Sequence, residues 1–141
     1  MSFVQTTAFA ALAAVLTLAG CNGEPPDKHP EQPVTKRRAV FKEMVRTLEP
    51  MGMVARDRKD YQAAEFLASA QALQKLASQP WPLFTPDSNY PPTHARVEVW
   101  QKPADFKAAQ DAFTGDVGAL VQAAQSQDLA RIKAAVNSVQ Q

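Results

Sequence analysis

Apolar side chains recur at every third or fourth position in four separate segments between Thr35 and Gln141. This spacing follows the turn of an α-helix and gives each segment one apolar face. The strict alternation of apolar and polar residues that marks a half-buried strand is absent from these segments. The sequence therefore predicts an all-α fold, a four-helix bundle formed by residues 35–141.

Prolines and capping residues divide the pattern into helices. Pro50 predicts a kink in the first helix, because it lacks an N–H and its ring crowds the preceding turn. Asp60 is expected to cap the second helix and Pro80 to stop it, while Pro103 begins the third and Ser126 caps the fourth. The apolar faces comprise Phe41, Met44, Leu48, Met51 and Ala55; Phe66, Ala70, Leu73 and Ala77; Phe106, Ala109, Phe113, Val117, Leu120 and Ala124; and Leu129, Ile132, Val136 and Val139.

A long loop, residues 79–102, separates the second and third helices. It holds five of the chain's 11 prolines together with Trp81, Phe84, Tyr90 and Trp100. Loops of this length are uncommon in small domains. Its aromatic side chains indicate that it packs over the helices.

The N-terminal segment indicates export. Residues 8–20 carry no charge but are shorter than the ~20 apolar residues that a membrane-spanning helix needs, as in the core of a signal peptide. Cys21, the only cysteine of the chain, ends a small-small-Cys sequence that resembles the site cut by lipoprotein signal peptidase. We therefore expect residues 1–20 to be a signal peptide, Cys21 to carry lipid and the protein to be anchored in the periplasm. Asn22 slightly favours the outer membrane.

Residues 21–34 are rich in proline and polar side chains and read as a tether. Pro25, Pro26, Pro30 and Pro33 favour an extended conformation that would lift the body ~30 Å from a lipid surface. His29 is expected to be a solvated residue of this tether.

Several classes of function are disfavoured. With Cys21 on lipid, no thiol remains for a disulfide, a zinc site or a nucleophile. A net charge of +1 and no basic cluster longer than Lys36-Arg37-Arg38 argue against nucleic acid as a partner. His94 lies in the loop without a second histidine nearby, which favours a surface residue over a metal ligand. We therefore assign no residue to a metal site. No Ser/His/Asp grouping or paired carboxylates stand out, so an enzyme is not expected.

Four short motifs resemble the cytochrome c′ family of exported four-helix bundles. They are Arg37 or Arg38 followed by Phe41-Lys42, Glu49-Pro50-Met51-Gly52 in the first helix, Trp81-Pro82 after the second, and Trp100 before Pro103-Ala104-Asp105-Phe106. The resemblance implies haem c as cofactor and a role in electron transfer or in binding a diatomic gas. Its partners would be a periplasmic redox protein or the gas, with a homodimer left open.

The resemblance also implies a C-x-x-C-H motif in the last helix, where two thiols attach haem and the imidazole binds iron. Residues 1–141 carry no such motif, and no histidine follows His94. Two explanations remain. The first, which we favour because the fourth helix is short, is a haem protein whose attachment segment lies beyond Gln141. The second is a haem-free bundle lipoprotein that acts as a periplasmic binding or interaction module. Noncovalent haem held by Met44 and His94 is a weaker third.

By the same resemblance, Phe41 matches the position over the open face of haem iron, with Met44 one turn further along. Arg37 and Arg38 would pair with the haem propionates. A thioether would bind iron and favour electron transfer, whereas a phenyl ring would leave iron open to a gas. The plainer alternatives are core packing for Phe41 and Met44 and an exposed helix face for the arginines.

Overall fold

The computed structural model of the chain describes residues 24–141. The expected signal peptide, residues 1–20, and Cys21 lie outside the described residues. Within the described part, no helix combines the length and the apolar character needed to cross a bilayer.

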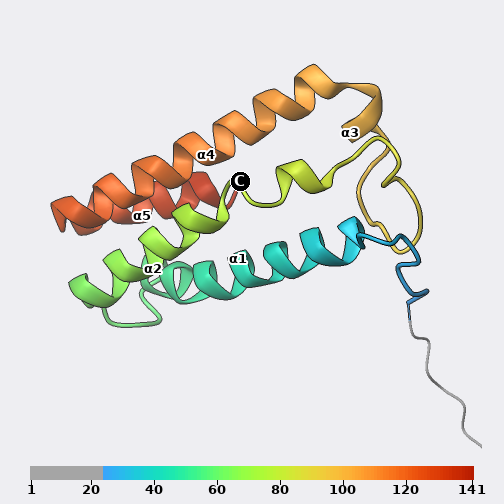
Figure 1. Ribbon diagram of the computed structural model, residues 1–141. Helices are drawn as coiled ribbons and strands as arrows, with labels where there is room; N and C mark the ends of the chain where they lie inside the picture. The colour runs from blue at the N-terminus through green and yellow to red at the C-terminus, as the bar shows by residue number, and fades with distance from the viewer. Residues whose placement is uncertain (1–23) are drawn as a thin grey trace, which may run out of the picture.

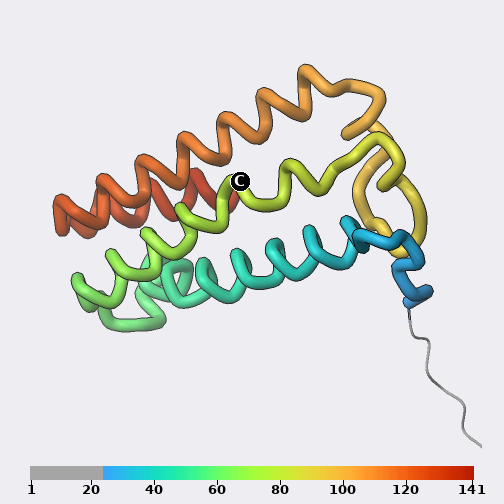
Figure 2. The backbone as a smooth tube through the Cα atoms, in the orientation of Figure 1, coloured from blue at the N-terminus to red at the C-terminus, as the bar shows by residue number. Residues whose placement is uncertain are grey.

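Four long helices form the body (Figures 1 and 2). They are α1 (Pro33–Ala55), α2 (Ala63–Leu76), α4 (Pro103–Ser126) and α5 (Leu129–Val139), while the loop between α2 and α4 holds the 3₁₀ helix η1 (Trp81–Leu83) and the short α3 (Glu98–Gln101). Residues 24–141 contain no strand. The predicted all-α four-helix bundle with a long loop is confirmed.

Two predicted helix caps are wrong. Helix α2 begins at Ala63 rather than directly after Asp60, and its N-cap residue Gln62 makes no side-chain cap. Ser126 still belongs to α4, because the chain leaves that helix only at Gln127, which has a left-handed backbone. Asp128 is the N-cap of α5, and its carboxylate accepts hydrogen bonds from the backbone N–H groups of Ala130 and Arg131.

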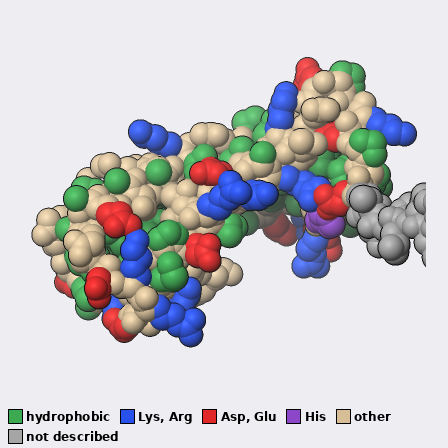
Figure 3. All heavy atoms as spheres, turned by 90° about the horizontal axis from the view of Figure 1, so that it is seen from below, with side chains coloured by type: hydrophobic (Ala, Val, Ile, Leu, Met, Phe, Trp, Pro, Cys, Tyr) green, Lys and Arg blue, Asp and Glu red, His purple; other side chains and the backbone are tan. Residues whose placement is uncertain are grey.

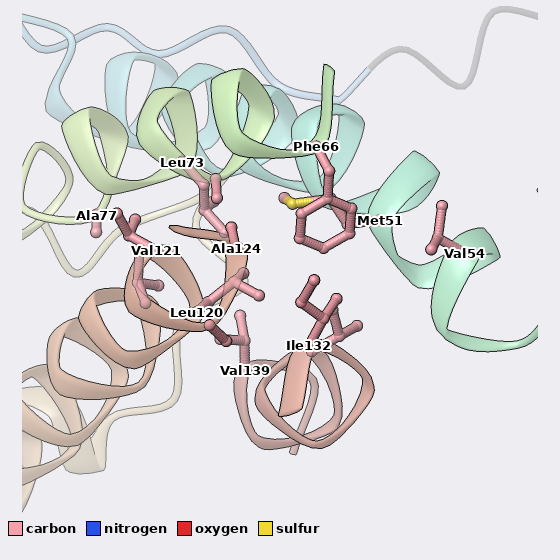
Figure 4. Packing of buried hydrophobic residues seen from close by; sticks show 14 of the residues in the cluster. Met51, Val54, Phe66, Leu73, Ala77, Leu120, Val121, Ala124, Ile132 and Val139 are labelled. Carbon is pink, nitrogen blue, oxygen red and sulfur yellow. The ribbon is translucent and has the colours of Figure 1, made fainter. Parts of the chain in front are cut away.

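The main core lies where all four long helices meet (Figure 4). It contains Met44, Met51 and Val54 of α1, Phe66, Ala70 and Leu73 of α2, Val117, Leu120, Val121, Ala123 and Ala124 of α4, and Ile132, Val136 and Val139 of α5. Helix α1 runs through Pro50 as one element, as expected. Most residues of the predicted apolar faces pack in or against this core, whereas Ala109 and Leu129 are exposed.

The fourth helix is shorter than its neighbours. Helix α4 has 24 residues and α5 has 11, or ~36 Å against ~16 Å. No residue of α4 before Val117 is buried, and Ala109, predicted as core, is exposed. The long loop, not a helix, covers this part of the bundle.

Residues 24–32, which we call the strap, are docked on the body. The Asp27 carboxylate is 8% exposed and accepts hydrogen bonds from the Thr35 N–H at 2.9 Å and the Tyr90 hydroxyl at 2.6 Å. Thr35 lies in the first turn of α1, whose own N-cap residue, Gln32, makes no side-chain cap. Asp27 therefore caps α1 from outside the helix.

Two further pairs join the strap to α1 and the loop. His29 Nε2 lies 3.0 Å from an Asp87 carboxylate oxygen, and the His29 ring stacks on Tyr90. Glu24 pairs with Arg38 at 2.6 Å and with His94 at 2.8 Å. The expectation that His29 is a solvated linker residue is wrong, and the strap does not extend away from the body. His94 is on the surface, as expected.

We expect Ile132→Ala to lower the free energy of unfolding by about 2–5 kcal/mol, because Ile132 is fully buried and its loss leaves a cavity. Leu129→Ala, in the same helix but 39% exposed, is the matched control and is expected to cost no more than about 0.5 kcal/mol. Urea denaturation of both variants measures the difference. Equal losses would contradict the placement of α5.

The Asp27 cap predicts a dependence on acid. Burial would raise the pKa of Asp27, but hydrogen bonds from Tyr90, Thr35 and His29 outweigh it and lower that pKa to about 2. A pKa below the unfolded value stabilises the fold above about pH 4, and this contribution is lost as pH falls towards 2. In acid titrations followed by circular dichroism, Asp27→Asn should therefore lose less stability than the wild type over this range. Glu31→Gln should follow the wild type, because the Glu31 side chain forms no hydrogen bond or ion pair among the described residues.

Candidate functional site

An apolar cavity of about 190 Å³ opens between α1, α2, η1 and α4. It lies beside the part of α4 that α5 does not cover. Its lining residues are all apolar: Phe41, Met44, Val45, Leu48, Leu73, Trp81 and Phe113. Such a lining excludes polar ligands and suits the flat face of an apolar group.

An aromatic cluster closes one side of the cavity. It consists of Phe41, Trp81, Phe84, Trp100, Phe106 and Phe113, drawn from α1, η1, the loop and α4. Ring centroids of neighbouring pairs lie between 5.0 Å (Phe84 and Phe106) and 6.5 Å (Trp81 and Phe84), mostly edge to face. The prediction that the loop aromatics pack over the body is confirmed.

Arg37 fastens the loop to α1. It is 2% exposed, and its two terminal nitrogens donate to four acceptors: the Leu83 carbonyl at 3.0 Å, the Ser88 hydroxyl at 2.8 Å, the Ser88 carbonyl at 3.0 Å and the Thr93 hydroxyl at 2.6 Å. The guanidinium carbon also lies 4.5 Å from the centre of the Phe84 ring and 5.6 Å from that of Trp100. Burial lowers the pKa of Arg37. In this structure the group predicted to meet a propionate holds the aromatic cluster in place.

Of the four residues predicted for the distal haem side, Phe41 and Met44 line the cavity together. Met44 is buried and Phe41 is half-buried. Arg37 and Arg38 are not lining residues, and Arg38 instead pairs with Glu24 of the strap. The structure thus brings the two apolar residues to one site and the two arginines to the strap and loop.

Sequence reasoning did not assign several lining residues to the site. Leu48, Leu73 and Phe113 belong to apolar stripes and were expected only as core. Trp81 carried a signal, since Trp81-Pro82 was one of the recognised motifs, but nothing placed it in a cavity. Its Nε1 is buried without a hydrogen-bond partner. Val45 lies off the stripe and is 65% exposed, so no pattern indicated that it borders the opening.

The cavity offers one thioether and no imidazole or thiol among its lining residues. Within residues 24–141, no group of three or more His, Cys, Asp or Glu side chains is placed to hold a metal ion. His94 pairs with Glu24 and does not line the cavity, so the structure does not bring it together with Met44.

Comparison with known proteins gives the family. The model of the family described as cytochrome c′ matches residues 32–141. The chain belongs to the cytochrome c′ family. The resemblance seen in its sequence motifs is thereby confirmed.

One curated relative is the cytochrome c′ of Alcaligenes xylosoxydans xylosoxydans, which is 32% identical over 110 residues, covering 78% of this chain and 85% of the relative. Among solved structures, a reduced arginine-to-alanine variant of cytochrome c′ from Alcaligenes xylosoxidans matches with a TM-score of 0.75 and 30% identity, over 82% of this chain and 90% of that one. A leucine-to-glycine variant of the same protein with bound carbon monoxide matches equally well, with the same TM-score, identity and coverage.

The family's cofactor is haem c, and residues 1–141 carry no C-x-x-C-H attachment motif. The cavity fits part of such a group, because its lining is apolar and aromatic. Its 190 Å³ is below the ~300–1,000 Å³ of pockets that enclose a whole organic ligand. Phe41, Met44 and Trp81 would contact the ring, whereas the described residues at the cavity provide no thiol for covalent attachment and no imidazole for iron.

We expect Arg37→Met to lower the free energy of unfolding by about 3 kcal/mol, because buried carbonyl and hydroxyl groups lose their donor. The two tryptophans of the chain, Trp81 and Trp100, both belong to the aromatic cluster, so acrylamide quenching of their fluorescence should rise as the loop loosens. Arg38→Met removes a more exposed arginine with a partner on the surface and should change both readouts little. Equal effects of the two substitutions would contradict the role given to Arg37.

Proposed function

We propose that this chain forms the distal side of an exported haem protein whose iron transfers electrons or binds a diatomic gas. The apolar cavity that holds both Phe41 and Met44 carries this proposal. Family membership supports haem chemistry in general. The periplasm as location and a lipid anchor on Cys21 are part of the proposal and rest on the N-terminal sequence pattern.

The chain's own contribution is to control what reaches the cavity. Its lining carries no charge and no hydrogen-bonding group exposed to the cavity, so water gains little by entering and an uncharged diatomic gas is not excluded. Arg37 keeps the aromatic cluster packed against α1. When bound, haem would supply an iron that exchanges one electron or takes up a gas.

Phe41 and Met44 lead to different chemistry at the same cavity. If haem were bound here, Phe41 would exclude water from the iron and leave it open to a gas, whereas the Met44 thioether would be able to bind iron and favour electron transfer. Both side chains line the cavity, one turn of α1 apart. We therefore propose that Phe41 controls access of water and gas to the iron, which we call the gate, with Met44 as the alternative iron ligand.

The decisive experiment is to produce the protein from its complete reading frame, with its own signal, in a host that attaches haem c. We expect a Soret absorption band that survives acid–acetone extraction and shifts when carbon monoxide is added to the reduced protein. Phe41→Ala should speed carbon monoxide binding by removing the ring at the opening. A colourless product would refute the haem proposal.

Met44→Leu separates the two kinds of chemistry. If Phe41 is the gate, this variant keeps the spectrum of the wild type without added gas, because leucine is similar in volume and cannot bind iron. If the sulfur binds iron, the spectrum of the reduced protein changes before any gas is added. Leu48→Met, at the same cavity, is the control for a change in packing alone.

The second candidate is a haem-free bundle lipoprotein that binds an apolar ligand or a protein partner. The observation that favours it is the composition of the site: an entirely apolar lining, with both histidines of the chain paired to carboxylates at the strap. It predicts a colourless protein that still enhances the fluorescence of an apolar dye, with Phe41→Trp reducing that enhancement by filling the cavity.

A further inference from the structure

The described chain begins at one end of the bundle. Figure 1 shows the strap beside the loop and α3, at the opposite end from the connection between α4 and α5. We call the surface formed by the strap, residues 84–97 and α3 the strap end. The two ends are separated by the length of α4, ~36 Å.

We propose that the strap end rests against a phospholipid surface and that the strap holds it there. This inference rests on the proposed lipidation of Cys21, but not on haem. Three Cα–Cα steps separate Cys21 from Glu24, the first strap residue with contacts to the body, so the two lie at most about 11 Å apart. A lipid on Cys21 would therefore leave no slack for the body to move far from the membrane.

The strap is held to the body by three of its residues, Glu24, Asp27 and His29. Glu24 binds Arg38 of α1 and His94 of the loop, and three residues further on Asp27 binds the first turn of α1 and Tyr90. His29 adds its contact with Asp87. These contacts join the strap to two different elements, so it cannot swing about one hinge.

Lysines on and beside this surface can meet the phosphate groups of phospholipids. Lys28 lies in the strap, and Lys36, Lys42 and Lys102 lie beside the strap end; none of the four forms an ion pair among the described residues. Four carboxylates have no Lys or Arg partner there either: Asp27, Glu31, Asp87 and Asp105. Glu24 pairs with Arg38, and Glu98 pairs with Arg96. Figure 3 shows basic side chains and a histidine close to the start of the described chain. The unpaired charges of the two signs are thus balanced, and the lysines can pair with the phosphate groups that neutral as well as anionic phospholipids carry.

Apolar groups on the same surface can meet the interface between head groups and acyl chains. Pro25 and Pro26 of the strap and Pro86 and Pro91 of the loop are exposed, and Val97, beside α3, is 44% exposed. None of them packs in the main core. Exposed apolar side chains bordered by lysines are typical of surfaces that lie on membranes.

The test places a fluorophore at each end of the full-length lipidated protein in vesicles of phosphatidylethanolamine and phosphatidylglycerol. Because acylation blocks Cys21, a single introduced cysteine is the only free thiol, at Val97→Cys in the strap end or at exposed Gln125→Cys near the end of α4. With brominated lipids, we expect loss of fluorescence at position 97 and none at position 125. Equal loss at both positions, or none at either, would overturn the proposal.

Strap variants test what holds the surface in place. In the Val97→Cys background, Glu24→Gln with Asp27→Asn removes the anionic contacts of the strap and should reduce quenching, while circular dichroism checks that the helices persist. Glu31→Gln makes the same kind of change at a strap residue whose side chain forms no hydrogen bond or ion pair among the described residues, and it should leave quenching unchanged. Undiminished quenching in the double variant would overturn the role given to the strap.

Mass spectrometry of the N-terminal peptide tests the lipidation of Cys21 separately from the contact between the strap end and the membrane. A diacylglyceryl group on Cys21 is expected, and its absence would overturn the membrane proposal at its first step. The haem spectrum is independent of this result, so a colourless but acylated and oriented protein would refute the proposed function alone.

Discussion

The arrangement of this protein depends on the unequal lengths of its helices. Four apolar faces need cover, but α5 reaches only the second half of α4, where every buried residue of α4 lies. The exposed apolar surface that remains on α1 and α4 must be covered by something other than a helix, because the hydrophobic effect would otherwise favour its association with another surface. The loop provides this cover with aromatic rings, whose large area compensates for the small number of residues. The cavity persists where rings and helices do not fill the space completely.

A loop that covers apolar surface has to be held in place, and Arg37 does this. Its charge is costly to bury, but each of its terminal nitrogens finds acceptors on the loop and its planar face lies against two aromatic rings. A lysine in this position could not satisfy four acceptors spread over three loop residues. The loop therefore takes one position relative to α1, and Trp81 is held beside Phe41.

Helical periodicity was sufficient to predict the bundle, because each apolar stripe is local to one helix and packing uses the same face. Met51, Leu73, Leu120 and Ile132 were all expected in the core and are fully buried there. The cap of α5 was missed for a local reason: Asp128 lies only two residues after Ser126, and the left-handed backbone of Gln127 between them makes Asp128 the cap. Phe41 and Met44 were predicted for the site through a resemblance, whereas Val45 and Trp81 reach it through three-dimensional packing that spacing does not encode. The docked strap was missed because proline-rich, polar composition describes the chain without its partners, and Asp27 finds its partner Tyr90 63 positions away.

Because Asp27 caps α1, proteolytic cleavage after the strap would change the stability of the domain. Most helices carry their caps within their own sequence, so trimming the segment before such a helix leaves it intact. Here the capping carboxylate belongs to the segment that would join the domain to its anchor, and it lies eight positions before the residue whose N–H group it binds. A protease that removed residues 24–32 would release the domain and at the same moment uncap its first helix. Shed and anchored forms of this protein would thus differ in lifetime as well as in location.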